Sequence, residues 1–134
     1  MDILLPMFTL VVFTLIIACV LGAVRFIAVQ KREIHPRYFK VFEGEVPEYM
    51  TRIARNYSNL LELPLLFYVI GVLLISLGVY DSTLVMLAWA YVISRFAHSA
   101  IHILYNNPLH RLIMFSISGS ILLAMWILTL MKLA

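Results

Sequence analysis

Residues 52–64 read RIARNYSNLLELP and open an apolar segment that continues to Leu77. Its polar residues recur at spacings of three and four: Arg52, Arg55, Asn59 and Glu62. Such spacings place side chains on one face of a helix. Charged groups at membrane depth are costly, so this face is expected to have partners. Arg52 and Arg55 could alternatively be interfacial cations that extend to water, whereas the deeper Asn59 and Glu62 predict a buried polar site.

The composition places the whole chain in the membrane class. Of its 134 residues, 63% are hydrophobic, and the mean hydropathy is +0.99. This length predicts a single domain over residues 1–134. The one cysteine, Cys19, excludes an internal disulfide framework. No basic patch with interleaved aromatic residues lies outside the apolar segments, so we expect no nucleic-acid partner.

Four segments are long enough to cross a bilayer, with expected helices over about 3–30, 47–77, 83–105 and 109–133. A signal peptide is the alternative for the first, but no basic region precedes it and Asp2 is acidic. The loop at 31–46 is polar and contains Pro36 and Gly44, which disfavour one continuous helix. These segments predict an all-α fold, an integral membrane four-helix bundle.

The sequence also marks several helix ends. Pro47 followed by Glu48 is typical of a first helical turn, and Pro64 predicts a kink within the second helix. The turn GVYDS at 78–82 offers Asp81 or Ser82 as a cap for the third helix.

The distribution of cations predicts the orientation. Seven of the ten Lys and Arg residues lie between Arg25 and Arg55. By the positive-inside rule, the 31–46 loop and the turn at 105–108 face the cytoplasm. We therefore expect a multi-pass protein of the inner or plasma membrane with both termini on the non-cytoplasmic side.

Polar residues of all four helices then converge in the cytoplasmic leaflet. The third helix contributes Arg95, His98 and His102 on one face, and the fourth begins with Arg111. Five arginines, with Arg25 on the first helix, face one acid, Glu62, even if Glu62 pairs with Arg95. This surplus predicts an anionic ligand. Arginine forks suit carboxylates and phosphates, so glutathione, a lipid phosphate and a fatty acid all fit this charge inventory.

The ordered motifs resemble the MAPEG family, membrane-associated proteins in eicosanoid and glutathione metabolism. They are R52-x-x-R55-x-x-x-N59-x-x-E62, then R95-F-A-H98-S-A-I-H102 and NPLHR111. The resemblance covers essentially the whole chain and implies a homotrimer that binds glutathione between subunits. It implies that Arg111 activates the thiol. It also implies that glutathione is held by Arg25, Arg55, Asn59, Glu62 and His102, with Arg52, Arg95 and His98 beside them.

Some positions depart from the pattern of the eicosanoid-forming members. Ser58 replaces an arginine, His102 replaces a tyrosine, and Leu112 and Phe115 replace hydroxyl residues. These departures indicate a divergent, prokaryotic-type member. The expected activity is that of a membrane-bound glutathione transferase or peroxidase acting on hydrophobic electrophiles, with lipophilic substrate arriving from the bilayer.

Three alternatives stand beside this interpretation. His98 and His102 could bind a metal with Glu62, although no further ligand cluster accompanies them, and we expect no metal. The protein could instead be a non-catalytic binder of membrane lipid or another anion, or a membrane assembly partner. Transport is disfavoured because the outer half of the bundle lacks polar groups that would continue a path.

Overall fold

The computed structural model describes residues 3–79 and 81–133. Asp2 and Tyr80, named above for the signal-peptide alternative and a turn, lie outside the described residues. The helices are α1 (Leu4–Gln30), α2 (Tyr38–Val41), α3 (Glu48–Ser76), α4 (Ser82–Leu104) and α5 (Pro108–Leu133). All but α2 are long and apolar enough to cross a membrane. The predicted all-α, four-helix membrane fold is confirmed.

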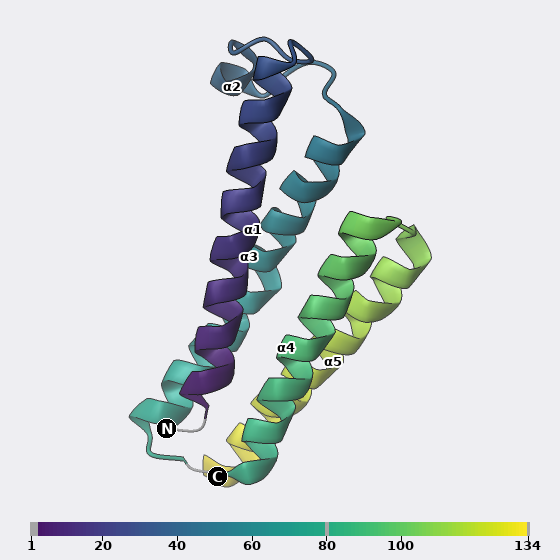
Figure 1. Ribbon diagram of the computed structural model, residues 1–134. Coiled ribbons are helices and arrows are strands. Elements are labelled where there is room, and N and C mark those ends of the chain that lie inside the picture. The colour runs from purple at the N-terminus through teal and green to yellow at the C-terminus, as the bar shows by residue number, and fades with distance from the viewer. Residues whose placement is uncertain (1–2, 80, 134) are drawn as a thin grey trace.

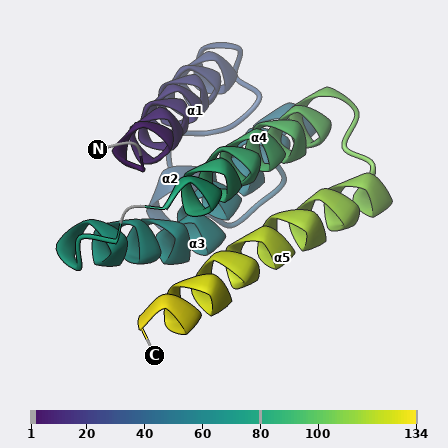
Figure 2. The same ribbon diagram turned by 90° about the horizontal axis from the view of Figure 1, so that it is seen from below.

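The helices α3 and α4 form the centre of the bundle. The helix α4 contacts α1, α3 and α5, whereas α1 and α5 do not contact each other within the described residues. Figure 2 shows α1 and α5 on opposite sides of the central pair. Both chain termini lie at one end of the bundle, here called the terminal end (Figure 1). The segment between α1 and α3 lies at the opposite end with the α4–α5 turn, and this is the connection end.

An apolar core holds the helices together over the terminal half. Phe67 of α3 stacks on Tyr91 of α4, with 4.6 Å between ring centroids. On the other side of α4, Phe96 lies 4.4 Å from Phe13 of α1. Gly71 lets α1 approach α3 closely, because a Cβ atom at this position would overlap the side chain of Met7. These contacts set the positions of α1, α3 and α4 relative to one another along the bundle axis.

The observed caps explain where the helices begin and end. Asp81 accepts a hydrogen bond from the Leu84 amide at 3.1 Å, so the expected cap of α4 is confirmed. Gly78, with φ of 64°, ends α3 in the left-handed conformation that favours glycine. The helix α3 runs through Pro64 without interruption. The short α2 was not predicted, because the sequence shows only a polar loop there.

Candidate functional site

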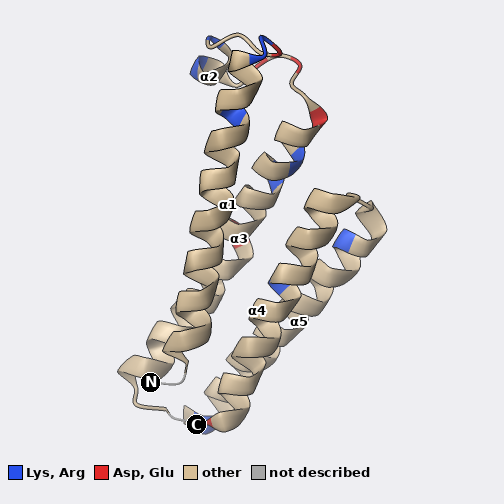
Figure 3. Ribbon diagram, in the orientation of Figure 1, with Lys and Arg blue, Asp and Glu red and all other residues tan. Residues whose placement is uncertain are grey.

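Charged residues gather at the connection end of the bundle (Figure 3). At the terminal end, Lys132 pairs with Asp81 at 2.6 Å. Within residues 3–79 and 81–133, the one other ion pair joins Arg52 to Glu48. The remaining arginines of the connection half therefore have no carboxylate partner among the described residues.

The inner face of α4 carries a stripe of buried polar side chains. Arg95, His98 and His102 are 0%, 2% and 0% exposed, and all three share the predicted face. The Arg95 guanidinium donates through Nη2 to the carbonyl oxygen of Asn59 on α3 at 2.9 Å. Its Nε and Nη1 atoms, the His98 Nδ1 atom and both His102 ring nitrogens have no partner within the described residues. Buried polar atoms are normally satisfied, so this stripe is suited to a polar ligand or water.

Asn56 faces this stripe from α3 and was not among the residues predicted for the site. Its side chain is fully buried, and neither amide atom has a hydrogen-bond partner in the described chain. The helices α3 and α4 are antiparallel, and Asn59 lies beside Arg95. One turn further toward the connection end, Asn56 is therefore level with Ser99, whose buried hydroxyl also lacks a described partner. The available signal was its spacing from Ile53 and Leu60, which places it on the apolar face of α3.

Arg111 reaches the same level from α5. The Ser94 hydroxyl donates to the Ser118 hydroxyl at 3.0 Å, which fixes the register between α4 and α5. Counting back along α5 brings Arg111 level with His102. Arg111 is partly exposed and donates through Nη1 to the Asn106 side chain at 3.0 Å. Its Nε atom is buried without a described partner.

The predicted polar face of α3 exists, but it points away from the chain's own core. Arg55 and Glu62 are exposed and Asn59 is partly exposed, so the expected burial of Glu62 is wrong for the single chain. The reason is geometric: Leu60 and Pro64 point inward, and Glu62, midway between them, falls on the opposite side of the helix. We call Arg52, Arg55, Asn59 and Glu62 the outer stripe.

The pairing of residues on α3 also differs from expectation. Arg52 Nε donates to Glu48 one turn earlier, at 3.0 Å. Glu62 forms no ion pair with Arg95 within the described residues. The surplus of arginine over acid thus persists, with Arg52 removed from it.

Arg25 lies apart from the α3–α4–α5 site. Its guanidinium lies over the rings of Phe39 and Phe42, 5.8 and 5.6 Å from their centroids. Such contacts are cation–π interactions, and they join the last turns of α1 to α2. In this arrangement Arg25 positions the connection rather than the buried stripe.

The arrangement of the histidines does not favour a metal centre. The rings of His98 and His102 lie 5.8 Å apart, whereas Glu62 points outward from α3. Among residues 3–79 and 81–133, no group of three or more His, Cys, Asp or Glu residues is placed to hold a metal ion.

Comparison with known proteins then identifies the family. No curated protein and no solved structure matches the chain. The family model of the MAPEG family matches residues 3–131, which is nearly the whole sequence. The four membrane-length helices agree with this match. The chain is therefore a multi-pass integral membrane protein of the glutathione and eicosanoid metabolism type, and it belongs to the MAPEG family.

Proposed function

We propose that this protein is a glutathione-dependent transferase or peroxidase that acts on hydrophobic electrophiles in the membrane. The observation that carries the proposal is the set of arginine side chains at the connection end that form no ion pair in the described chain. Arg55, Arg95 and Arg111 have no carboxylate partner within the described residues. Family membership supports glutathione as the ligand. When bound, glutathione supplies a thiol whose thiolate form is a strong nucleophile.

The donor set fits this tripeptide. Its two carboxylates suit arginine forks, and its ammonium suits the Glu62 carboxylate. The Asn59 side chain, one turn from both Arg55 and Glu62, can bind an amide between them. Arg52 and Arg25 would first have to exchange their contacts with Glu48 and with the aromatic rings of α2. The residues assigned to glutathione seating are Arg25, Arg52, Arg55, Asn59, Glu62, Arg95, His98 and His102.

Arg111 is assigned the catalytic role. A neighbouring cation lowers the pKa of a thiol from its ordinary value of about 8.5 and so favours thiolate at neutral pH. Arg111 is partly exposed, and Asn106 orients its guanidinium through one hydrogen bond. The apolar side chains of Leu112 and Phe115 follow on the same helix and would limit water near the sulfur.

An apolar groove supports a lipophilic second substrate. It lies between α1 and α3, is lined by residues that include Val11, Leu61 and Tyr68, and has a volume of about 240 Å³. Leu61 borders Glu62 of the outer stripe in sequence. A lipophilic molecule that enters from the bilayer would thus lie in the groove beside the outer stripe.

The outer stripe also supports a homotrimer with the site between subunits. Arg55 and Glu62 are exposed on the single chain, yet they belong to a membrane-length helix. Charges at this depth are rarely left against lipid, so a second copy of the chain would cover them. The concentration of cations supports a cytoplasmic connection end, with both termini on the non-cytoplasmic side of the inner or plasma membrane.

A non-catalytic lipid binder is the second candidate. Leu112 and Phe115, which follow Arg111, are 60% and 39% exposed. A phosphate or fatty-acid carboxylate on Arg111, with its chain along these residues, would use the same cation without thiol chemistry.

Activity and binding together test the proposal. Purified protein in nanodiscs would be assayed for glutathione conjugation to chlorodinitrobenzene and for reduction of a lipid hydroperoxide. Arg111→Ala should abolish the thiolate absorbance and turnover, whereas Asn59→Ala should weaken glutathione binding measured by calorimetry. Lys31→Ala, which removes an exposed cation outside the site, is the charge-matched control. Absence of both glutathione binding and turnover would favour the second candidate.

A further inference from the structure

The connection between α1 and α3 folds back against the end of α1 through α2. The Arg25 guanidinium lies beneath Phe39 and Phe42, so these rings descend to the level of the last two turns of α1. Phe39 and Tyr38 also pack against a small cluster formed by Ala28, Ile34 and Met50. The helix α2 is therefore held beside the last two turns of α1, a helix long and apolar enough to cross a membrane.

The part of α2 that does not pack on this cluster exposes large apolar side chains. Val41 is 64% exposed and Phe42 is 57% exposed. Phe26, adjacent to Arg25 on α1, is 64% exposed. Arg37 and Lys40 are exposed in the same segment. Apolar side chains alternating with cations are typical of segments that lie in the membrane interface.

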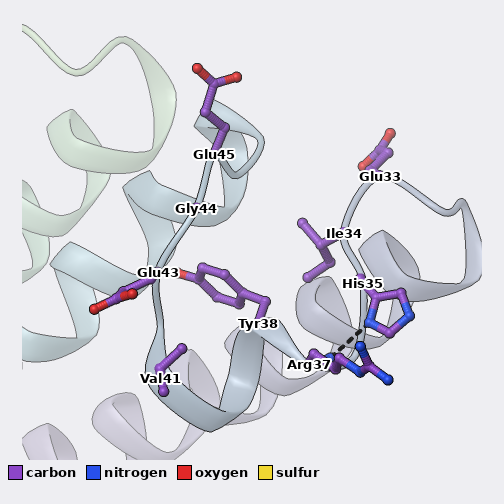
Figure 4. Close-up of a pocket in the computed structure, with 9 residues that line it drawn as sticks. All are labelled: Glu33, Ile34, His35, Arg37, Tyr38, Val41, Glu43, Gly44 and Glu45. Carbon is purple, nitrogen blue, oxygen red and sulfur yellow. Dashed lines mark hydrogen bonds between the residues drawn. The ribbon is translucent and has the colours of Figure 1, made fainter.

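Three acids of the connection, Glu33, Glu43 and Glu45, line one pocket together with Arg37 and Val41. Glu33 accepts a hydrogen bond from Tyr49, and Phe42, with φ of 56°, turns the chain before Glu43. The pocket, of about 500 Å³, lies between the two parts of the connection. In Figure 4 the carboxylates of Glu33 and Glu45 point away from Val41, whereas the Glu43 side chain lies on the same side of the pocket as Val41.

We propose that α2 docks on the membrane surface, with Val41 and Phe42 among the lipid chains and Arg37 and Lys40 on anionic lipid phosphates. The occupant is lipid because α1 and α3 enter the bilayer on either side of the connection, and because Arg37 and Lys40 complement acidic headgroups. This proposal does not depend on glutathione binding or on which leaflet the connection faces.

Site-directed fluorescence tests this docking. In a Cys19→Ser background, an environment-sensitive label would be placed at Val41→Cys, with Glu45→Cys as the matched control in the same connection. Nanodiscs of phosphatidylcholine, with or without phosphatidylglycerol, would carry either nitroxide lipids or soluble iodide as quencher. The label at position 41 should be quenched by nitroxide lipid, more strongly with phosphatidylglycerol, and the label at position 45 by iodide.

The charges are tested by Arg37→Gln and Lys40→Gln. Each should lower the equilibrium constant for docking of α2 on anionic nanodiscs roughly fivefold. Equal iodide quenching at positions 41 and 45 would overturn the proposal. Protection of position 41 from both quenchers would overturn it in favour of a second protein chain. Lipid contact that is indifferent to phosphatidylglycerol would contradict the phosphate pairing.

Discussion

The two ends of the bundle differ in how many of their charged side chains form ion pairs. At the terminal end, Asp81 caps α4 and pairs with Lys132, so one acid and one cation satisfy each other. At the connection end, Arg55, Arg95 and Arg111 lack carboxylate partners in the described chain. Among the described arginines of this end, Arg52 alone is paired, with Glu48 one turn away. The surplus at this end points to a partner outside the chain.

The connection end itself has two polar surfaces. Asn56 and Arg95 belong to the buried interior, whereas Arg55 and Glu62 belong to the outer stripe. On the proposed function, glutathione would reach the exposed outer stripe first, with the buried residues behind it. Substitutions on the two surfaces should therefore have different consequences for binding and for stability.

The largest expected effect is on ligand binding by the outer stripe. Arg55→Ala should weaken glutathione binding by roughly 10- to 100-fold, because hydrogen bonds to charged groups contribute about 1.5–3 kcal/mol. Without glutathione, its thermal unfolding should change little, because Arg55 has no carboxylate partner within the described residues to lose. Calorimetric titration beside a thermal melt measures both. A large loss of stability with intact binding would show that Arg55 is structural.

The next effect sharpens the contrast with the interior. Asn56→Leu should raise stability by about 1–3 kcal/mol, because it removes two buried amide atoms that lack partners. Denaturant unfolding in detergent would measure the change, with the partly exposed Asn59→Leu as control. A stabilised variant that binds less glutathione would place Asn56 in the site, as expected where stability is sacrificed for function. A destabilised variant would mean that Asn56 is already satisfied by enclosed water.

A smaller effect on stability is expected from the hydrogen bond that sets the register between α4 and α5 and so brings Arg111 level with His102. Ser94→Ala and Ser118→Ala should each cost about 1 kcal/mol, and the double variant should cost less than their sum. Unfolding of the two single variants and the double variant gives the coupling energy. Additive losses would indicate that this hydrogen bond does not join the helices.

The smallest effect is at the terminal end. The Lys132 ammonium, then the Leu84 amide, lower the pKa of Asp81 below its ordinary value. Because the pKa of Asp81 is lower in the folded state, its ionised carboxylate stabilises the fold. This contribution to stability is present above about pH 4 and is lost as the pH falls through the folded-state pKa. Asp81→Asn keeps a cap and removes the charge, so the melting temperature of this variant should fall less than that of the wild type when the pH is lowered. An unchanged pH profile would contradict the pairing.

Much of the fold follows from the sequence because bilayer length and capping are local signals. Hydropathy predicts the four long helices, and Asp81 marks the start of α4. The spacing of the polar residues on α3 predicts that they share a face, yet it does not say which way that face points. Here Leu60 and Pro64 decide the direction, and Glu62 therefore faces outward.

Other features depend on contacts that no local pattern encodes. The helix α2 has only four residues, and it is held in place by the contact between the Arg25 guanidinium of α1 and the aromatic ring of Phe39. Asn56 looks in sequence like one more polar residue near Arg55, and only packing against α4 shows that it is buried. The Arg52–Glu48 pair, by contrast, was accessible to sequence reasoning, because it joins neighbouring turns of one helix.

The central claim is that the unpaired cations of the connection end receive an anionic tripeptide. Its most direct test is a calorimetric titration of the wild-type protein in nanodiscs with glutathione. The account predicts saturable binding that weakens with added salt, since arginines supply the attraction. No detectable binding at millimolar glutathione would contradict it, and the surplus charge would then belong to a lipid or another anion.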